Sequence, residues 1–303
     1  MTRLLPTLCA SLLLGLALRA AEPAAPIRLL VRADDLGNAQ STNEAAIRSF
    51  REGIAKSVEI IAPGQWTPEA VRLVAATPGI DVGVHLCLTS EWEGSKWRPL
   101  TTAPSLVDEF GYFVPERNQP KDSARHLGVL GFAFDLREVE TELRAQIGSL
   151  QKQLAAAGAP ASALSHFSTH MAVADGTTEL RALTERLGEE NHAWVLEKGL
   201  RRLLDTKFLA AEFPAAAEKL RDPKTREAGI VEILEKLPSG DWLWVTHPAL
   251  DTPEIRGFNL AGGENVAEMR AADFRCITSE KIKEVIHRRG IQLISYRDLA
   301  AKN

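Results

Sequence analysis

The sequence predicts an α/β fold, a single distorted (β/α) barrel of about seven mainly parallel strands. Short apolar segments typical of strands alternate with amphipathic helical segments over most of the chain, which is the pattern of βαβ units. Ionisable residues follow several predicted strands at the point where each strand ends. The composition is that of a globular protein, because 45% of the residues are hydrophobic and 25% are charged. Collagen-like, disordered and disulfide-rich proteins are thereby excluded.

Residues 1–20 are typical of a secretory signal peptide that is cleaved from the mature chain. A positive charge at Arg3 precedes an apolar run over residues 8–18, and alanines follow it. This run is too short to span ~30 Å of hydrocarbon comfortably. The alternative is an uncleaved signal that anchors the chain, which is the only membrane contact that the sequence suggests. We therefore expect a secreted or periplasmic protein whose mature chain starts with a linker at residues 21–26.

The predicted domain covers residues 27–303, and its first part alternates strands with helices. Apolar runs predict strands at residues 27–33, 57–62 and 80–88. Helical spacing predicts helices at residues 43–53, with Ser41 or Thr42 as N-cap, and at 67–76, with Pro68 in the first turn.

Residues 90–131 interrupt this alternation. The segment is rich in Pro, Gly, Trp and charge and is too long for a plain connection, so we expect a lid-like or binding insertion. The alternation then resumes with further helices and apolar strands. Helices are expected at 136–157, 177–188, within 199–237 and at 279–289, and strands at 163–169, 193–196, 241–247 and 291–295.

Charge and cysteine content narrow the choice of partners. The 36 Lys and Arg residues do not outnumber the 40 Asp and Glu residues, so no basic excess exists to bind nucleic acid. Beyond the signal peptide the chain has two cysteines, Cys87 and Cys276, and sequence spacing does not show whether they pair. The oligomeric state is also open, and a homo-oligomer is compatible with these data.

Polar residues at the ends of predicted strands form the candidate site. Asp34 and Asp35 end the first strand, and His85, His170 and His247 lie at the ends of three others. Each has a structural alternative, an Asx turn for the aspartates or a hydrogen-bonded core position for a histidine. However, the carboxyl ends of parallel strands share one face, where the active sites of α/β proteins are built. We therefore expect these side chains to converge.

This residue set is suited to metal-assisted hydrolysis. One carboxylate and two imidazoles can bind a divalent ion while leaving positions open for water. A second carboxylate can accept a proton from that water, and a further histidine can donate one to a leaving group. Among the other histidines, His166 is interpreted as supporting or structural, and His126, His192 and His287 as surface residues.

The motifs resemble those of the YdjC-like carbohydrate deacetylases. The matching stretches appear in family order over almost the whole mature chain, and they are RADDLGNAQSTNEAAIRSFREGI (32–54), IDVGVHLCLT (80–89), LSHFSTHM (164–171), THPALD (246–251) and ITSEKIKEVIHRRGIQLISYRDL (277–299). The resemblance implies a distorted α/β barrel that removes acetyl groups from N-acetylated sugars or oligosaccharides with one divalent ion, usually Mg²⁺. The donor set would also suit Zn²⁺.

Carried over by position, the resemblance implies that Asp35, His85 and His170 bind the ion. Asp34 would be the general base, and His247 would act as the acid or as an oxyanion partner. Ser168 departs from the family pattern, which has an acidic residue there that served substrate contact or orientation of a metal ligand.

Two alternative functions are compatible with these residues. The chain could be an exported glycan-binding protein with little turnover, or another metal-dependent esterase or phosphatase. Trp92, Trp97 and Tyr112 of the insertion could bind sugar rings, or they could pack the insertion onto the barrel. Trp242 and Trp244 are expected in the core because they alternate with apolar residues on a strand.

Overall fold

The computed structural model describes residues 25–160, 163–260 and 266–300. The predicted signal peptide at 1–20 and most of the predicted linker lie outside these residues. Within them, no helix has both the length and the apolar character that crossing a membrane requires.

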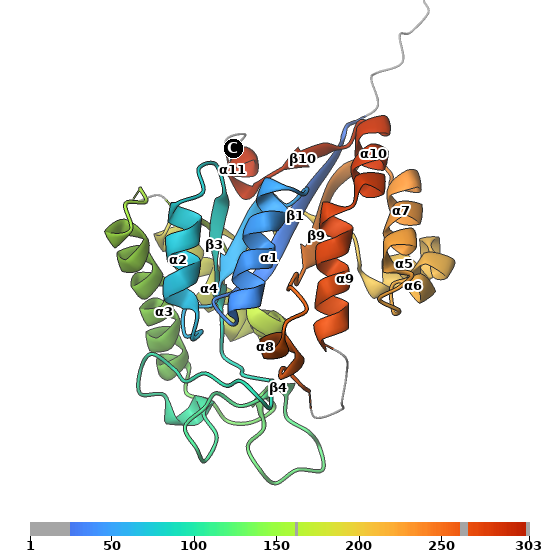
Figure 1. Ribbon diagram of the computed structural model, residues 1–303. Coiled ribbons are helices and arrows are strands. Elements are labelled where there is room, and N and C mark those ends of the chain that lie inside the picture. The colour runs from blue at the N-terminus through green and yellow to red at the C-terminus, as the bar shows by residue number, and fades with distance from the viewer. Residues whose placement is uncertain (1–24, 161–162, 261–265, 301–303) are drawn as a thin grey trace, which may run out of the picture.

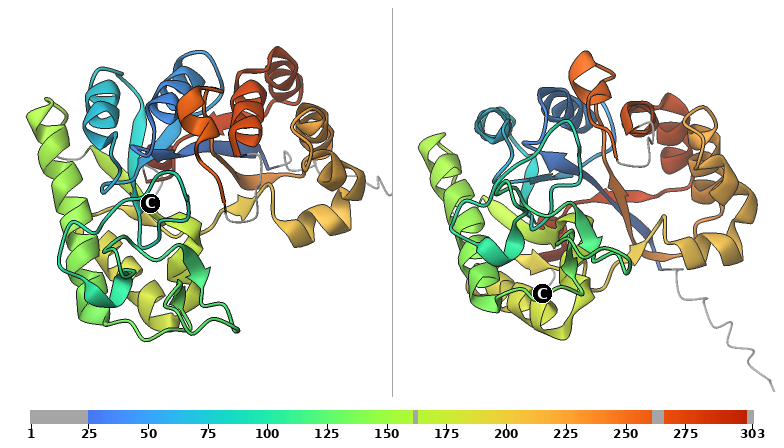
Figure 2. Two further views of the ribbon diagram at one scale, coloured as in Figure 1. Left: turned by 60° about the horizontal axis from the view of Figure 1, so that its bottom comes forward. Right: turned by 90° about the horizontal axis from the view of Figure 1, so that it is seen from below.

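A curved sheet of eight strands, counted over the described residues, forms the centre of the fold, and all its strand pairs are parallel. The order is β7-β6-β3-β2-β1-β9-β8, with β10 beside β1 on the same edge as β2. The sheet curves without closing, so the predicted distorted barrel is confirmed as an open one (Figure 2). The strands are β1 (Ile27–Leu36), β2 (Ser57–Ile60), β3 (Asp81–Leu86), β6 (Leu164–Thr169), β7 (Trp194–Val195), β8 (Arg201–Arg202), β9 (Gly240–Thr246) and β10 (Gln292–Ile294).

Helices cover the outside of this sheet, and α1 lies side by side with α2 and α9 (Figure 1). The short strand β8 and the helices α8 and α9 were not predicted, whereas the helical character of most of 199–237 is confirmed. The helices are α1 (Gln40–Arg51), α2 (Thr67–Ala75), α3 (Leu136–Ala156), α4 (Thr178–Glu190), α5 (Thr206–Glu212), α6 (Pro214–Lys219), α7 (Arg226–Lys236), α8 (Pro253–Arg256), α9 (Val266–Thr278), α10 (Glu280–Arg288) and α11 (Tyr296–Ala300).

The beginning of α1 differs from the expectation. The helix starts at Gln40, so neither Ser41 nor Thr42 is its N-cap, and Ala39 in the cap position makes no side-chain hydrogen bond. The carboxylate of Glu254 on α8 instead accepts hydrogen bonds from the backbone N–H groups of Gln40 and Ser41, each at 3.2 Å. A distant acidic side chain therefore caps the positive end of this helix.

The core lies between the sheet and its helices. Strand β1 is buried over most of its length, as expected for a central strand of a parallel sheet with both faces covered. Trp242 and Trp244 of β9 are fully buried, which confirms the prediction that they belong to the core. Cys87 and Cys276 are both buried and free, and burial raises their thiol pKa values to about 11 and about 12.

The insertion gathers below the end of β3, from which the chain enters it (Figure 1). It contains a short parallel pair, β4 (Glu116–Asn118) and β5 (Gly128–Leu130), and a 3₁₀ turn η1 (Pro104–Leu106). Trp92 and Trp97 are 5% and 2% exposed, which supports the alternative that they pack the insertion onto the barrel, and Trp92 also borders a cavity at the strand ends. Trp97 donates a hydrogen bond to the Thr89 carbonyl at 2.9 Å, and Tyr112 stacks under the Arg98 guanidinium. The tryptophans pack the insertion onto the barrel.

Replacing Gly83 by alanine is expected to destabilise the fold. Gly83 on β3 pairs with His166 on β6, and an added Cβ would overlap the His166 ring. Because that ring is buried and stacks on Tyr296 at 3.9 Å, overpacking should lower the free energy of unfolding by about 1–3 kcal/mol. The matched control is Gly148→Ala in α3, where an added Cβ meets no atom within 4 Å and helix propensity favours alanine. Urea unfolding should separate the two variants, and equal stabilities would contradict this expectation.

Candidate metal and catalytic site

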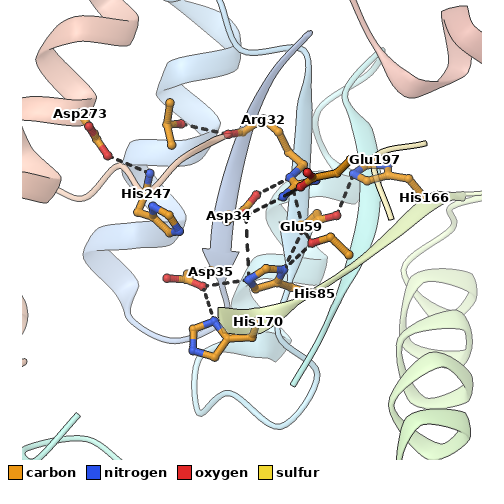
Figure 3. Close-up of polar contacts among 12 residues, drawn as sticks. Arg32, Asp34, Asp35, Glu59, His85, His166, His170, Glu197, His247 and Asp273 are labelled. Carbon is orange, nitrogen blue, oxygen red and sulfur yellow. Dashed lines mark hydrogen bonds and ion pairs between the residues drawn. The ribbon is translucent and has the colours of Figure 1, made fainter. Parts of the chain in front are cut away.

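The ends of β1, β3 and β6 bring three predicted metal ligands together (Figure 3). Asp35, His85 and His170 are buried, and their ligand atoms all lie within 4.8 Å of one another. Asp35 Oδ1 is 3.4 Å from His85 Nε2 and 3.2 Å from His170 Nδ1. The convergence expected from the strand ends is therefore present.

Irregular backbone explains how two consecutive aspartates reach one place. Successive side chains of a regular strand point to opposite faces of a sheet. Here the register between β1 and β2 shifts between Ala33 and Leu36, and Asp35 has a φ of 70°. As a result, both Asp34 and Asp35 have a carboxylate oxygen within 4 Å of His85 Nε2, at 3.9 and 3.4 Å. The irregular backbone at the end of β1 therefore places both carboxylates beside His85.

The free oxygen of Asp35 fits a divalent ion. Oδ1 is buried and accepts no hydrogen bond, while Oδ2 accepts one from Arg270 Nη2 at 2.6 Å. Burial alone would raise the pKa of Asp35, but Arg270 and His170 outweigh it and hold the pKa well below its usual range. An ionised carboxylate with a free oxygen facing two imidazole nitrogens is a ligand set that a divalent cation can complete.

Each of the two histidines has a carboxylate on its other ring nitrogen. Glu59 Oε2 on β2 lies 2.8 Å from His85 Nδ1, and Glu91 Oε2 of the insertion lies 2.8 Å from His170 Nε2. Burial would lower the pKa of His170, but nearby carboxylates, Glu91 foremost, raise it well above its usual value. Such carboxylates fix the orientation of metal-binding histidines.

Sequence reasoning missed both glutamates. Glu59 had a detectable signal, because a glutamate inside the apolar strand SVEI is unusual and needs a buried partner. Glu91 had none, since it lies in an irregular segment.

Asp34, the predicted general base, is held by a buried arginine. Arg32 donates from Nε to Asp34 Oδ1 at 2.6 Å and from Nη2 to Oδ2 at 2.9 Å. Burial opposes ionisation of Asp34, but this guanidinium more than compensates and lowers its pKa. Arg32 also contacts Tyr296 Oη at 2.8 Å and Glu197 at 3.2 Å, so it connects β1 to two distant parts of the chain.

A second group of potential ligands is less suited to a metal. Asp34, Glu59 and His85 also have ligand atoms within 4.8 Å of one another. However, Arg32 Nε lies 2.6 Å from Asp34 and 3.4 Å from Glu59, so a positive charge already stands between these carboxylates. A second cation there would meet electrostatic repulsion at close range.

A cavity of about 400 Å³ opens beside the first group. His247 lines it and is held through its backbone N–H by Asp273 Oδ2 at 3.0 Å. Burial lowers the pKa of His247, so its imidazole is neutral at pH 7. The lining also includes Asp35, Glu91, Trp92, His170, Arg226 and Arg270.

The remaining histidines mostly lie where the sequence placed them. His166 is buried, stacks on Tyr296 and hydrogen-bonds with Ser165, so the structural interpretation is confirmed. His192 and His287 are exposed. His126 is partly exposed, and its ring stacks on Phe132 at 4.1 Å.

A comparison of the sequence with known protein families identifies the family of this chain. The family described as YdjC-like protein matches residues 28–288. This chain belongs to the YdjC-like family. The resemblance found in the sequence motifs is thereby confirmed over most of the chain.

Named relatives match this chain over most of its length. The chain is 26% identical over 280 residues to a protein of Listeria innocua named carbohydrate deacetylase 1, covering 90% of this chain and 100% of that protein. It is 27% identical over 285 residues to a carbohydrate deacetylase of Brevibacillus brevis, with the same coverage. A crystal structure from Enterococcus faecalis, of a protein named for cellobiose-phosphate cleavage, matches with a TM-score of 0.67 at 22% identity, covering 91% of this chain and 99% of that one. This last similarity shows a shared fold.

Proposed function

We propose that this YdjC-like protein is a metal-dependent hydrolase that removes acetyl groups from N-acetylated sugars or glycans. The observation that carries the proposal is the convergence of Asp35, His85 and His170 beside a cavity of about 400 Å³. The relatives named as carbohydrate deacetylases support the reaction class.

One divalent ion would be held by Asp35 Oδ1, His85 Nε2 and His170 Nδ1. Such an ion polarises an acyl oxygen and makes bound water more acidic. The two imidazoles favour Zn²⁺, whereas the family resemblance favours Mg²⁺. A metal titration with both ions distinguishes them.

Two residues of this chain would move or hold protons. Asp34 is the proton acceptor in the proposal, since Arg32 keeps its carboxylate ionised beside His85. His247 is neutral and retains one ring N–H. It can therefore donate a hydrogen bond to the acetyl oxygen, a role that its lowered pKa favours over that of a stored proton source.

The substrate in this proposal is an N-acetylated oligosaccharide outside the cytoplasm. The signal-like residues 1–20 support export, so an envelope or environmental glycan is the expected substrate class.

Acetate release from N-acetylated chitooligosaccharides should therefore require a divalent ion. Chelation is expected to abolish release, and adding back Mg²⁺ or Zn²⁺ is expected to restore it. Coupled acetate detection measures both steps. Activity that survives complete metal removal would contradict the mechanism. Sugar binding without acetate release, in the presence of metal, would indicate a glycan-binding protein, and hydrolysis of ester or phosphate substrates alone would indicate a different hydrolase.

A further inference from the structure

His85 is held by two side chains from different strands. Its Nδ1 atom lies 2.8 Å from Glu59 Oε2 and 2.9 Å from Ser168 Oγ. Ser168 in turn donates a short hydrogen bond to the same Glu59 oxygen. These contacts close a triangle on the side of the ring that faces away from Asp35, where Figure 3 shows Glu59 beside His85.

Burial makes this triangle selective for one orientation of His85. Glu59 is 0% exposed and Ser168 is 4% exposed, so solvent does not compete for these contacts. Arg32 Nε lies 3.4 Å from Glu59 Oε2 and compensates its charge. A carboxylate that accepts from Nδ1–H leaves the Nε2 lone pair free, and Nε2 is the atom that faces Asp35 Oδ1.

Ser168 stands at a position that could itself have supplied a carboxylate. Its Oγ is already within hydrogen-bond distance of His85 Nδ1, so an aspartate at this position would reach the same atom if Glu59 were shortened. In this chain β6 supplies the hydroxyl of Ser168. The carboxylate comes from Glu59 on β2, which lies on the other side of β3 from β6.

We propose that Glu59 is the positioning residue of His85. Together with Ser168 it fixes the tautomer and the ring orientation that turn Nε2 toward the metal position. The inference rests on the proposed function only in requiring that His85 binds a divalent ion. A carboxylate in this position typically changes metal affinity without contacting the metal.

The first test measures the affinity for Zn²⁺ and Mg²⁺ alone by competition with a chelating indicator. Glu59→Gln is expected to weaken binding about 10- to 100-fold. The control is Glu142→Gln, which alters an equally buried carboxylate that accepts hydrogen bonds from the backbone N–H groups of Leu100 and Thr101 and has no direct contact with His85. Glu142→Gln should leave metal affinity unchanged even if it lowers stability.

The decisive variant moves the carboxylate to the other strand. The double variant Glu59→Ser, Ser168→Asp is expected to recover most of the affinity lost in Glu59→Gln, because the new carboxylate reaches the same nitrogen. Unchanged affinity in Glu59→Gln would overturn the inference and leave the proposed function intact. A folded double variant as weak as Glu59→Gln would overturn it as well. A wild-type chain that binds no divalent ion would overturn both.

A measurement on the wild type keeps the test independent of variant folding. In the zinc-loaded protein, ¹⁵N shifts of His85 are expected to show Nδ1 protonated and Nε2 as the ligand. Ligation through Nδ1 would overturn the positioning role of Glu59.

Discussion

Replacing Asp35 by asparagine is expected to abolish tight binding of the divalent ion and to lower acetate release about 10³-fold or more. The substitution keeps the size of the side chain but removes the charge of the one carboxylate that faces both imidazoles. It also leaves Arg270, buried at 6% exposure, without its charged partner. Metal stoichiometry and acetate release measure the two effects.

The control for this variant is Asp251→Asn. Asp251 is likewise paired with an arginine, Arg256, from which it accepts two hydrogen bonds, but this pair lies on the surface. The Asp251→Asn protein should retain both metal binding and acetate release. An Asp35→Asn protein that binds the ion and turns over like wild type would remove Asp35 from the ligand set.

Replacing Arg32 by methionine is expected to destabilise the protein by about 3–5 kcal/mol. Arg32 is 2% exposed and pairs with Asp34 and Glu59, which are themselves buried. Methionine fills much of the space but leaves two buried carboxylates without their positive partner. Urea unfolding followed by tryptophan fluorescence measures the loss in free energy of unfolding.

A surface arginine with the same hydrogen-bond geometry provides the control for the Arg32→Met variant. Arg256 contacts Asp251 at 2.6 and 2.9 Å, the same distances as between Arg32 and Asp34, but its side chain is 62% exposed. Arg256→Met is expected to cost only about 0–1 kcal/mol, because water solvates both charges. If both variants lost equally little stability, burial of the Arg32 cluster would not be the source of its contribution.

The parts of the site that could be predicted from the sequence all lie at strand ends. Asp35, His85 and His170 were found because a parallel α/β fold places such ends on one face. The same rule could not find Arg32 and Glu59, which lie within strands and face other buried charges. Arg270 was also missed, because α9 was not predicted and its arginine reaches Asp35 across 235 positions of sequence.

In the insertion, too, the sequence did not reveal which side chains are buried or what they contact. Its composition predicted that the chain leaves the barrel at residues 90–131. Aromatic content alone did not reveal that Trp92 and Trp97 are buried, nor that Glu91 contacts His170. Irregular segments have no period from which the direction of a side chain can be inferred.

The amino-acid sequence was enough to predict the parallel α/β class, the resemblance to the family and the convergence of three candidate metal ligands. These follow from local periodicity and from the geometry that parallel strands share. The pairing of the buried charged groups became visible only in the folded chain, where Arg32 pairs with Asp34, Arg270 pairs with Asp35, and Glu59 contacts His85. A buried charge needs a partner in space, and here most of those partners come from elements far apart in the chain.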